Sequence, residues 1–192
     1  MFSSSAPADQ ILILSGGGNP EINNYSQYLE AKTLTNELRS MLPRTNVNVL
    51  FGYGNSNGQP PIISDVRRTI RDQRTGAERD IMVPGSIFSN KSATRENVDK
   101  YFQEGAFASM KDDETFFLLV GGHGIKSANE DEEILSENSI ITLWHTKYLD
   151  SIGSVKLGGL DERGINRRDL SKLILDNGAA GKAVFAMSQC YS

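Results

Sequence analysis

The sequence has few of the residues from which disulfides, metal centres and nucleic-acid interfaces are built. Its 192 residues include one cysteine and two histidines. A single cysteine excludes an internal disulfide, and with two histidines a structural zinc site of cysteine and histidine ligands is not expected. The formal net charge of −4 disfavours nucleic acid as the main partner. We therefore expect a protein without a metal ion or another cofactor.

Long hydrophobic runs are also absent. No apolar run approaches the length that crosses a bilayer, so we expect no membrane partner. The N-terminus lacks a basic stretch followed by an apolar one, so no signal peptide is visible and we expect a cytoplasmic protein. The length fits a single domain over residues 1–192, in which the mixed segment 126–164 is an insertion or loop region.

What the sequence does contain is an alternation of short apolar runs and segments of helical period. The apolar runs predict buried strands at 11–14, 47–51, 115–120 and 183–187. Apolar residues at three- and four-residue steps predict helices over 24–42, 95–104 and 167–176, the last two capped by Thr94 and Asn166. Ser64 is a candidate cap for a further helix over 65–73. Residues 140–144 predict a short strand, paired in a hairpin with 155–157. This order of elements predicts an α/β fold with a mostly parallel sheet and helices on both faces.

The chain has one basic cluster, which surrounds the expected helix over 65–73. We interpret it as a solvated helix face because acidic residues interrupt it. The arginines of this cluster are Arg67, Arg68, Arg71, Arg74 and Arg79.

Two of the expected strands lead to a reactive side chain. His123 follows the strand 115–120 between glycines, and Cys190 follows the strand 183–187. Because the carboxyl ends of parallel strands meet at one edge of a sheet, we expect the two residues to lie together. A thiol beside an imidazole predicts a cysteine nucleophile with its acid–base partner, as in a peptidase.

The other requirements of amide hydrolysis have candidates in the same segments. The backbone N–H groups of Gly124 and Cys190 are candidate donors to the oxyanion. No carboxylate lies at an obvious position to orient the imidazole, so we expect a backbone carbonyl to do so. Two other interpretations stay open, namely that Cys190 is a buried, inert thiol and that His145 is the functional histidine.

At these residues the chain resembles the caspase-like cysteine peptidases (clan CD), and most closely the legumain-like family. The likeness is carried by the His-Gly pair after one hydrophobic strand, the Gln-Cys pair after a later one, and Asn24-Tyr25 after the first strand. It implies a caspase-like three-layer αβα sandwich and an endopeptidase with a Cys190–His123 dyad, acting on a protein or peptide substrate. It also implies a zymogen that processes itself, for which the acidic segment 129–137 is a candidate site.

The chain departs from this family in two ways. Where legumain-like enzymes have a basic residue that helps to build the P1 pocket, it has Ser26 and Gln27, and Glu21 in the same loop is a candidate to receive a basic P1 side chain. The chain also ends two residues after Cys190, before the C-terminal strands of a caspase-like fold. We expect a second chain or a C-terminal fragment to supply them, because a sheet ending at 183–187 would expose an apolar edge.

Two other functions compete with a peptidase. The first is an inactive caspase-like scaffold that binds a protein partner. The second is a phosphate or nucleotide binder that uses the glycine-rich turn 15–19, because such turns can cradle anions. That turn lacks the glycine spacing of the dinucleotide-binding and P-loop motifs.

Overall fold

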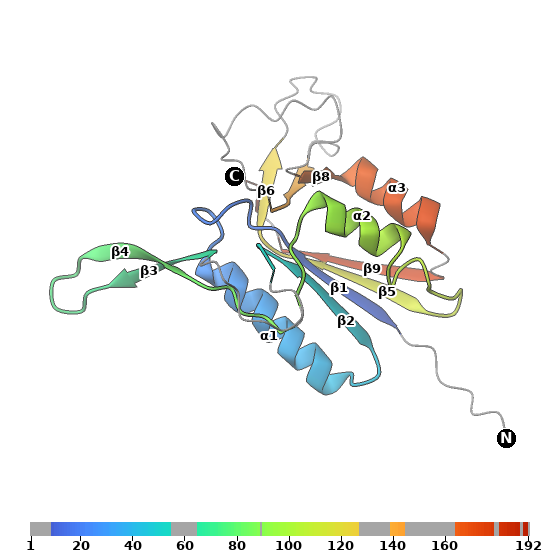
Figure 1. Cartoon of the computed structure of the whole chain (residues 1–192), viewed down its shortest axis with the longest axis horizontal. Helices are drawn as coiled ribbons and strands as arrows, with labels where there is room; N and C mark the ends of the chain where they lie inside the picture. The colour runs from blue at the N-terminus through green and yellow to red at the C-terminus, as the bar shows by residue number, and fades with distance from the viewer. Residues whose placement is uncertain are drawn as a thin grey trace.

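The computed structural model of the chain describes residues 9–54, 65–88, 90–126, 139–144, 164–178, 181–188 and 190–191. Within these residues the central sheet has four strands in the order β2 (Asn46–Phe51), β1 (Gln10–Ser15), β5 (Thr115–Val120) and β9 (Lys182–Met187) (Figure 1). Every neighbouring pair is parallel. The predicted mixed α/β fold with a mostly parallel central sheet is therefore confirmed.

Helices cover both faces of this sheet. The helix α1 (Tyr25–Met41) packs on one face, and α2 (Arg95–Gln103) and α3 (Arg167–Asn177) pack on the other (Figure 1). The strand β1 serves both cores because alternate side chains point to opposite faces. Ile11 and Ile13 join the core under α1, while Leu12 and Leu14 join the core under α2 and α3. No helix among the described residues is long and apolar enough to cross a membrane.

The helices α2 and α3 begin at the residues that the sequence predicted. Thr94 precedes α2 and its side chain accepts a hydrogen bond from the backbone N–H of Asn97. Asn166 precedes α3 and accepts a bond of 2.7 Å from the N–H of Asp169. Both residues satisfy backbone donors that a helix start leaves unpaired, which explains why the helices begin there.

A second small sheet lies beyond the carboxyl ends of β5 and β9. Its order is β10 (Cys190–Tyr191), β6 (His123–Lys126), β7 (Ser139–Thr142) and β8 (Gly164–Asn166). The expected strand over 140–144 is thus present, and it pairs with β6 and β8. The partner expected for it, 155–157, lies outside the described residues.

The helix predicted over 65–73 is wrong. Val66–Arg71 forms the strand β3, which pairs in antiparallel fashion with β4 (Glu78–Val83). A turn joins the strands, in which Asp72 accepts two backbone N–H bonds and Gly76 takes a φ of 74°. The pairing supplies the backbone hydrogen bonds that a helix would have made, so the basic cluster lies on a hairpin that projects from the sheet (Figure 1).

The strand β9 is present as predicted, but the expectation that it is buried is wrong. Its burial pattern is exposed along its whole length, and Val184, Phe185 and Met187 are each nearly half exposed. It is the outermost strand and pairs with β5 alone among the described strands. Among the described residues, no strand pairs with the other edge of β9, which lies beside exposed apolar side chains.

Candidate active site

The backbone pairing brings the two predicted reactive residues together. His123 begins β6 just after β5, and Cys190 begins β10 just after β9. The two short strands run parallel, with Cys190 opposite His123 and Tyr191 opposite Gly124. Because β5 and β9 are themselves neighbours in register, the site lies at the carboxyl edge of the central sheet.

The glycines before His123 have a structural reason. Gly122 takes a φ of 99°, a backbone conformation that side chains disfavour. A Cβ atom there would lie 3.2 Å from the hydroxyl oxygen of Ser15. Just before Gly122, the N–H of Gly121 donates to the carbonyl of Leu14. The turn therefore ties β6 to the end of β1 and holds His123 at the edge of the sheet.

A backbone carbonyl holds the imidazole ring, as the sequence had suggested. The Nε2 atom of His123 lies 2.8 Å from the carbonyl oxygen of Ile22. A carbonyl oxygen can only accept, so this contact requires a hydrogen on Nε2. The neutral ring then has its lone pair on Nδ1, which is the nitrogen free to take a proton.

Asn24 is a residue of the site to which the sequence analysis assigned no role beside His123. It occupies the position before α1 where an asparagine normally caps the helix, yet its side chain makes no capping bond. Its Oδ1 atom accepts a bond of 3.0 Å from Arg67, and its Nδ2 atom lies 3.4 Å from Nε2 of His123. The Asn24-Tyr25 pair was the signal in the sequence, but its contact with His123 is made across the fold.

The proposed oxyanion donor Gly124 is buried in the middle of β6. It lies opposite Ile141 of β7 on one side and Tyr191 of β10 on the other. A strand therefore lies on each side of Gly124, and its role as a donor to substrate stays a prediction.

Of the three residues predicted to bind substrate, Gln27 alone is among the lining residues of the cavity beside α1. Glu21 lies exposed in the turn after β1, where its N–H donates to Asn19. Ser26 is exposed in the first turn of α1, and Gln27 lines a cavity. The acidic segment 129–137 and His145 lie outside the described residues.

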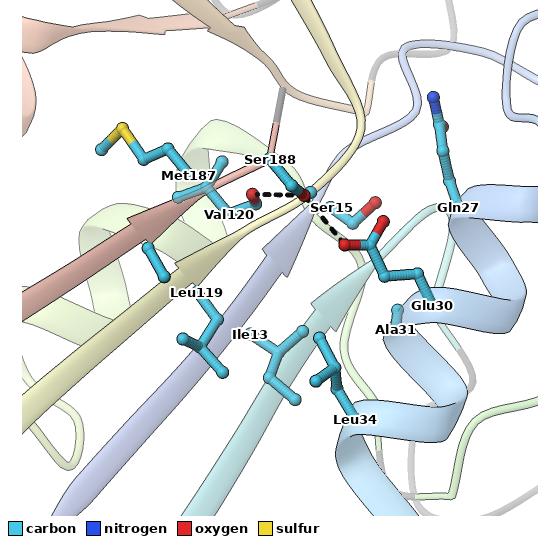
Figure 2. Close-up of a pocket in the computed structure, with 12 residues that line it drawn as sticks. Ile13, Ser15, Gln27, Glu30, Ala31, Leu34, Leu119, Val120, Met187 and Ser188 are labelled. Carbon is cyan, nitrogen blue, oxygen red and sulfur yellow. Dashed lines mark hydrogen bonds between the residues drawn. The ribbon is translucent and has the colours of Figure 1, made fainter. Parts of the chain in front are cut away.

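The cavity that Gln27 lines lies between α1 and the ends of β1, β5 and β9, and its volume is about 230 Å³ (Figure 2). Its floor is apolar, with Ile13, Leu34 and Leu119 among its lining residues. At one end Glu30 reaches from α1 and accepts a 2.9 Å bond from the hydroxyl of Ser188. The cavity therefore combines an apolar interior with a carboxylate, on the same edge of the sheet as His123.

Other parts of the chain occupy the space beside the glycines of the turn 15–19. A side chain at Gly16 would collide with the backbone of Thr142, and one at Gly17 would collide with Asn23. The glycines therefore permit close packing of the chain, which removes the main reason to interpret the turn as an anion cradle. Within the described ranges, no three His, Cys, Asp or Glu side chains are grouped so that they could hold a metal ion.

Comparisons of the chain with protein-family models, with curated proteins and with solved structures each give no match.

Proposed function

We propose that the protein is a cysteine endopeptidase with a caspase-like αβα sandwich fold, in which Cys190 is the nucleophile and His123 the acid–base residue. The observation that supports this best is the parallel pairing of β10 with β6, in which Cys190 lies opposite His123. The helices on both faces of the parallel sheet, and the position at its carboxyl edge, are consistent with the proposal.

The proposed reaction begins when Nδ1 of His123 takes the proton of the Cys190 thiol. The thiolate attacks the carbonyl carbon of the substrate, and backbone N–H groups at Gly124 and Cys190 stabilise the oxyanion. The imidazolium gives its proton to the leaving amine, which leaves a thioester. His123 then deprotonates a water molecule, whose attack on the thioester releases the acid and restores the thiol. The carbonyl of Ile22 keeps the ring hydrogen on Nε2 and so leaves Nδ1 as the nitrogen that carries the proton.

A thiol-directed peptidyl inhibitor tests the proposal. A chloromethyl ketone or acyloxymethyl ketone peptide should alkylate Cys190, which mass spectrometry of the digested protein locates directly. The Cys190→Ala and His123→Ala proteins should each lose cleavage of a peptide library down to the uncatalysed background. Wild-type cleavage by the Cys190→Ala protein would end the proposal.

A His145→Ala protein is the matched control, because the chain has two histidines. It should keep its activity if His123 is the acid–base residue. Loss of activity on changing His145, with activity retained on changing His123, would reverse the assignment of the two histidines.

We also propose that a further segment, from a second chain or a C-terminal fragment, completes the fold beside β9. The support is the exposed apolar edge of that strand. Hydrogen exchange provides a test. The outward amides of β9 should exchange quickly in the 192-residue chain and slowly once the completing segment is present. Equal rates in both forms would contradict the proposal.

A non-catalytic scaffold is the second candidate function, and the same exposed edge favours it. An extended peptide of a partner can add a strand to an unpaired edge. An intact Cys190 that is not alkylated, in a protein whose β9 amides become protected on binding a partner, would select this function. A cytoplasmic location stays a prediction, which cell fractionation would check.

A further inference from the structure

The start of β3 is hydrogen-bonded to the residues that precede α1, next to the candidate active site. The backbone N–H of Arg67 donates to the carbonyl of Asn23 over 2.8 Å, and Arg67 pairs with Asn24 in an isolated parallel bridge. Beside it, the guanidinium of Arg68 lies 4.6 Å from the ring centre of Tyr25. These contacts bring the side chain of Arg67 to Asn24, which is 43 positions away in the sequence.

Arg67 determines which way the amide of Asn24 faces. Its Nη2 atom lies 3.0 Å from Oδ1 of Asn24. A guanidinium has hydrogen-bond donors and no acceptor, so the amide oxygen must face it. A reversed amide would set two donors against each other. The NH₂ group of Asn24 is therefore turned toward Nε2 of His123, 3.4 Å away.

Two neighbours of Nε2 consequently favour opposite tautomers of His123. The carbonyl of Ile22 needs a hydrogen on Nε2, whereas the NH₂ group of Asn24 needs a lone pair there. The contact with Ile22 is the shorter, at 2.8 Å, so the tautomer with the hydrogen on Nε2 prevails. Asn24 opposes this preference only as long as Arg67 holds its oxygen.

We propose that Arg67 is a positioning residue, which orients Asn24 and thereby sets the tautomer balance of His123. If Arg67 released Asn24, the amide could turn and give Nε2–H a second acceptor. A ring held by two acceptors at Nε2 would return its proton to the leaving amine less readily. The missing cap of α1 fits this role, because the side chain of Asn24 is used for Arg67 and His123 in its place. This catalytic consequence rests on the proposed function, whereas the tautomer balance does not.

Nitrogen-15 NMR of histidine-labelled protein tests the proposal without an activity measurement. The chain has two histidines, and a His145→Gln variant identifies the signals of His123. At a pH where the rings are neutral, Arg67→Met should move the Nε2 signal toward the value of a protonated nitrogen and the Nδ1 signal away from it. Arg67→Glu should move both signals further, because a carboxylate attracts the NH₂ group of Asn24. Arg67→Lys keeps a donor and should stay near the wild type.

Arg71→Met is the matched control. Arg71 lies on the same strand and the same face as Arg67, and it is exposed. It should leave the ring signals unchanged. Unchanged signals in both Arg67→Met and Arg67→Glu would overturn the proposal, and so would equal shifts in Arg71→Met. Fluorescence of Trp144, the single tryptophan, confirms that each variant is folded.

Kinetics then separate this proposal from the proposed function. In Arg67→Met, kcat should fall roughly tenfold with KM unchanged, because acid–base catalysis as a whole is worth about 10²–10⁴. A fall in kcat for Arg71→Met of the same size would contradict the proposal. If the wild-type protein does not cleave peptides, the peptidase is refuted, while the ring signals still decide the role of Arg67.

Discussion

Replacing Phe102 by alanine removes the centre of a ring cluster between α2 and the sheet. The side chain of Phe102 is fully buried. Its ring centre lies 5.3 Å from that of Tyr101, 4.9 Å from that of Phe107 and 5.8 Å from that of Phe116. Such truncations lower the free energy of unfolding by about 3–5 kcal/mol. The apolar area that the ring buries gives a loss of the same size, since roughly 150 Å² at about 25 cal/mol per Å² is worth about 4 kcal/mol.

Unfolding in urea, followed through the fluorescence of Trp144, measures this loss. Trp144 is the single tryptophan and is buried, so its emission should change when the core opens. The midpoint of thermal unfolding should fall by roughly 6–20 °C, because 1 kcal/mol shifts it by about 2–4 °C in a chain of this size.

Phe88→Ala is the matched control for Phe102→Ala. Phe88 is 72% exposed, and its ring lies 5.9 Å from the guanidinium carbon of Arg39. Its removal should cost less than about 1 kcal/mol. The reasoning would be refuted if Phe102→Ala cost less than about 1.5 kcal/mol, or if the two variants lost equal stability.

Three further predictions concern a cap, a buried carboxyl and the exposed strand. Asn166→Ala should lower the free energy of unfolding by about 1 kcal/mol in urea titrations, since its side chain caps α3; an unchanged value would contradict the cap. Burial raises the pKa of Asp65 above its ordinary 3.8, against the opposing effect of N–H bonds from Gly85 and Tyr53. The protonated carboxyl of Asp65 therefore contributes its full stabilisation of the fold below pH 3.8, and this contribution is lost as the pH rises through the raised pKa. Asp65→Asn should consequently gain stability relative to the wild type between about pH 3 and pH 7. A difference in the free energy of unfolding between the two proteins that does not change with pH would refute this. Val184→Lys should reduce self-association of the 192-residue chain in sedimentation, because a charge protects an open edge, and unchanged association would count against that edge as the contact.

The elements that the sequence predicted correctly each have one dominant local signal. The run Ile11 to Leu14 is short, continuously apolar and ended by a glycine-rich turn, which favours a buried strand. Thr94 and Asn166 mark the starts of their helices through bonds made within three residues. The strand β3 has no such signal. Val66 and Ile70 are compatible with a helix or a strand, and the choice depends on pairing with residues 78–83.

The exposure of β9 could not be predicted for a related reason. Residues 183–187 of β9 form an apolar run like that of β5, although β5 is largely buried and β9 is exposed. Whether such a strand is central or outermost depends on which strands lie beside it, which is a property of the whole sheet.

By itself, the sequence determined that a parallel sheet forms and that His123 and Cys190 follow the carboxyl ends of two of its strands. Hydrophobic period and glycine placement act over a few residues, so they can be read from the chain. Only the tertiary structure decided that Cys190 lies opposite His123, that the carbonyl of Ile22 holds Nε2, and that Asn24 faces Arg67 in place of capping α1. Each of these contacts joins residues more than forty positions apart, and the order in which strands and helices pack determines them.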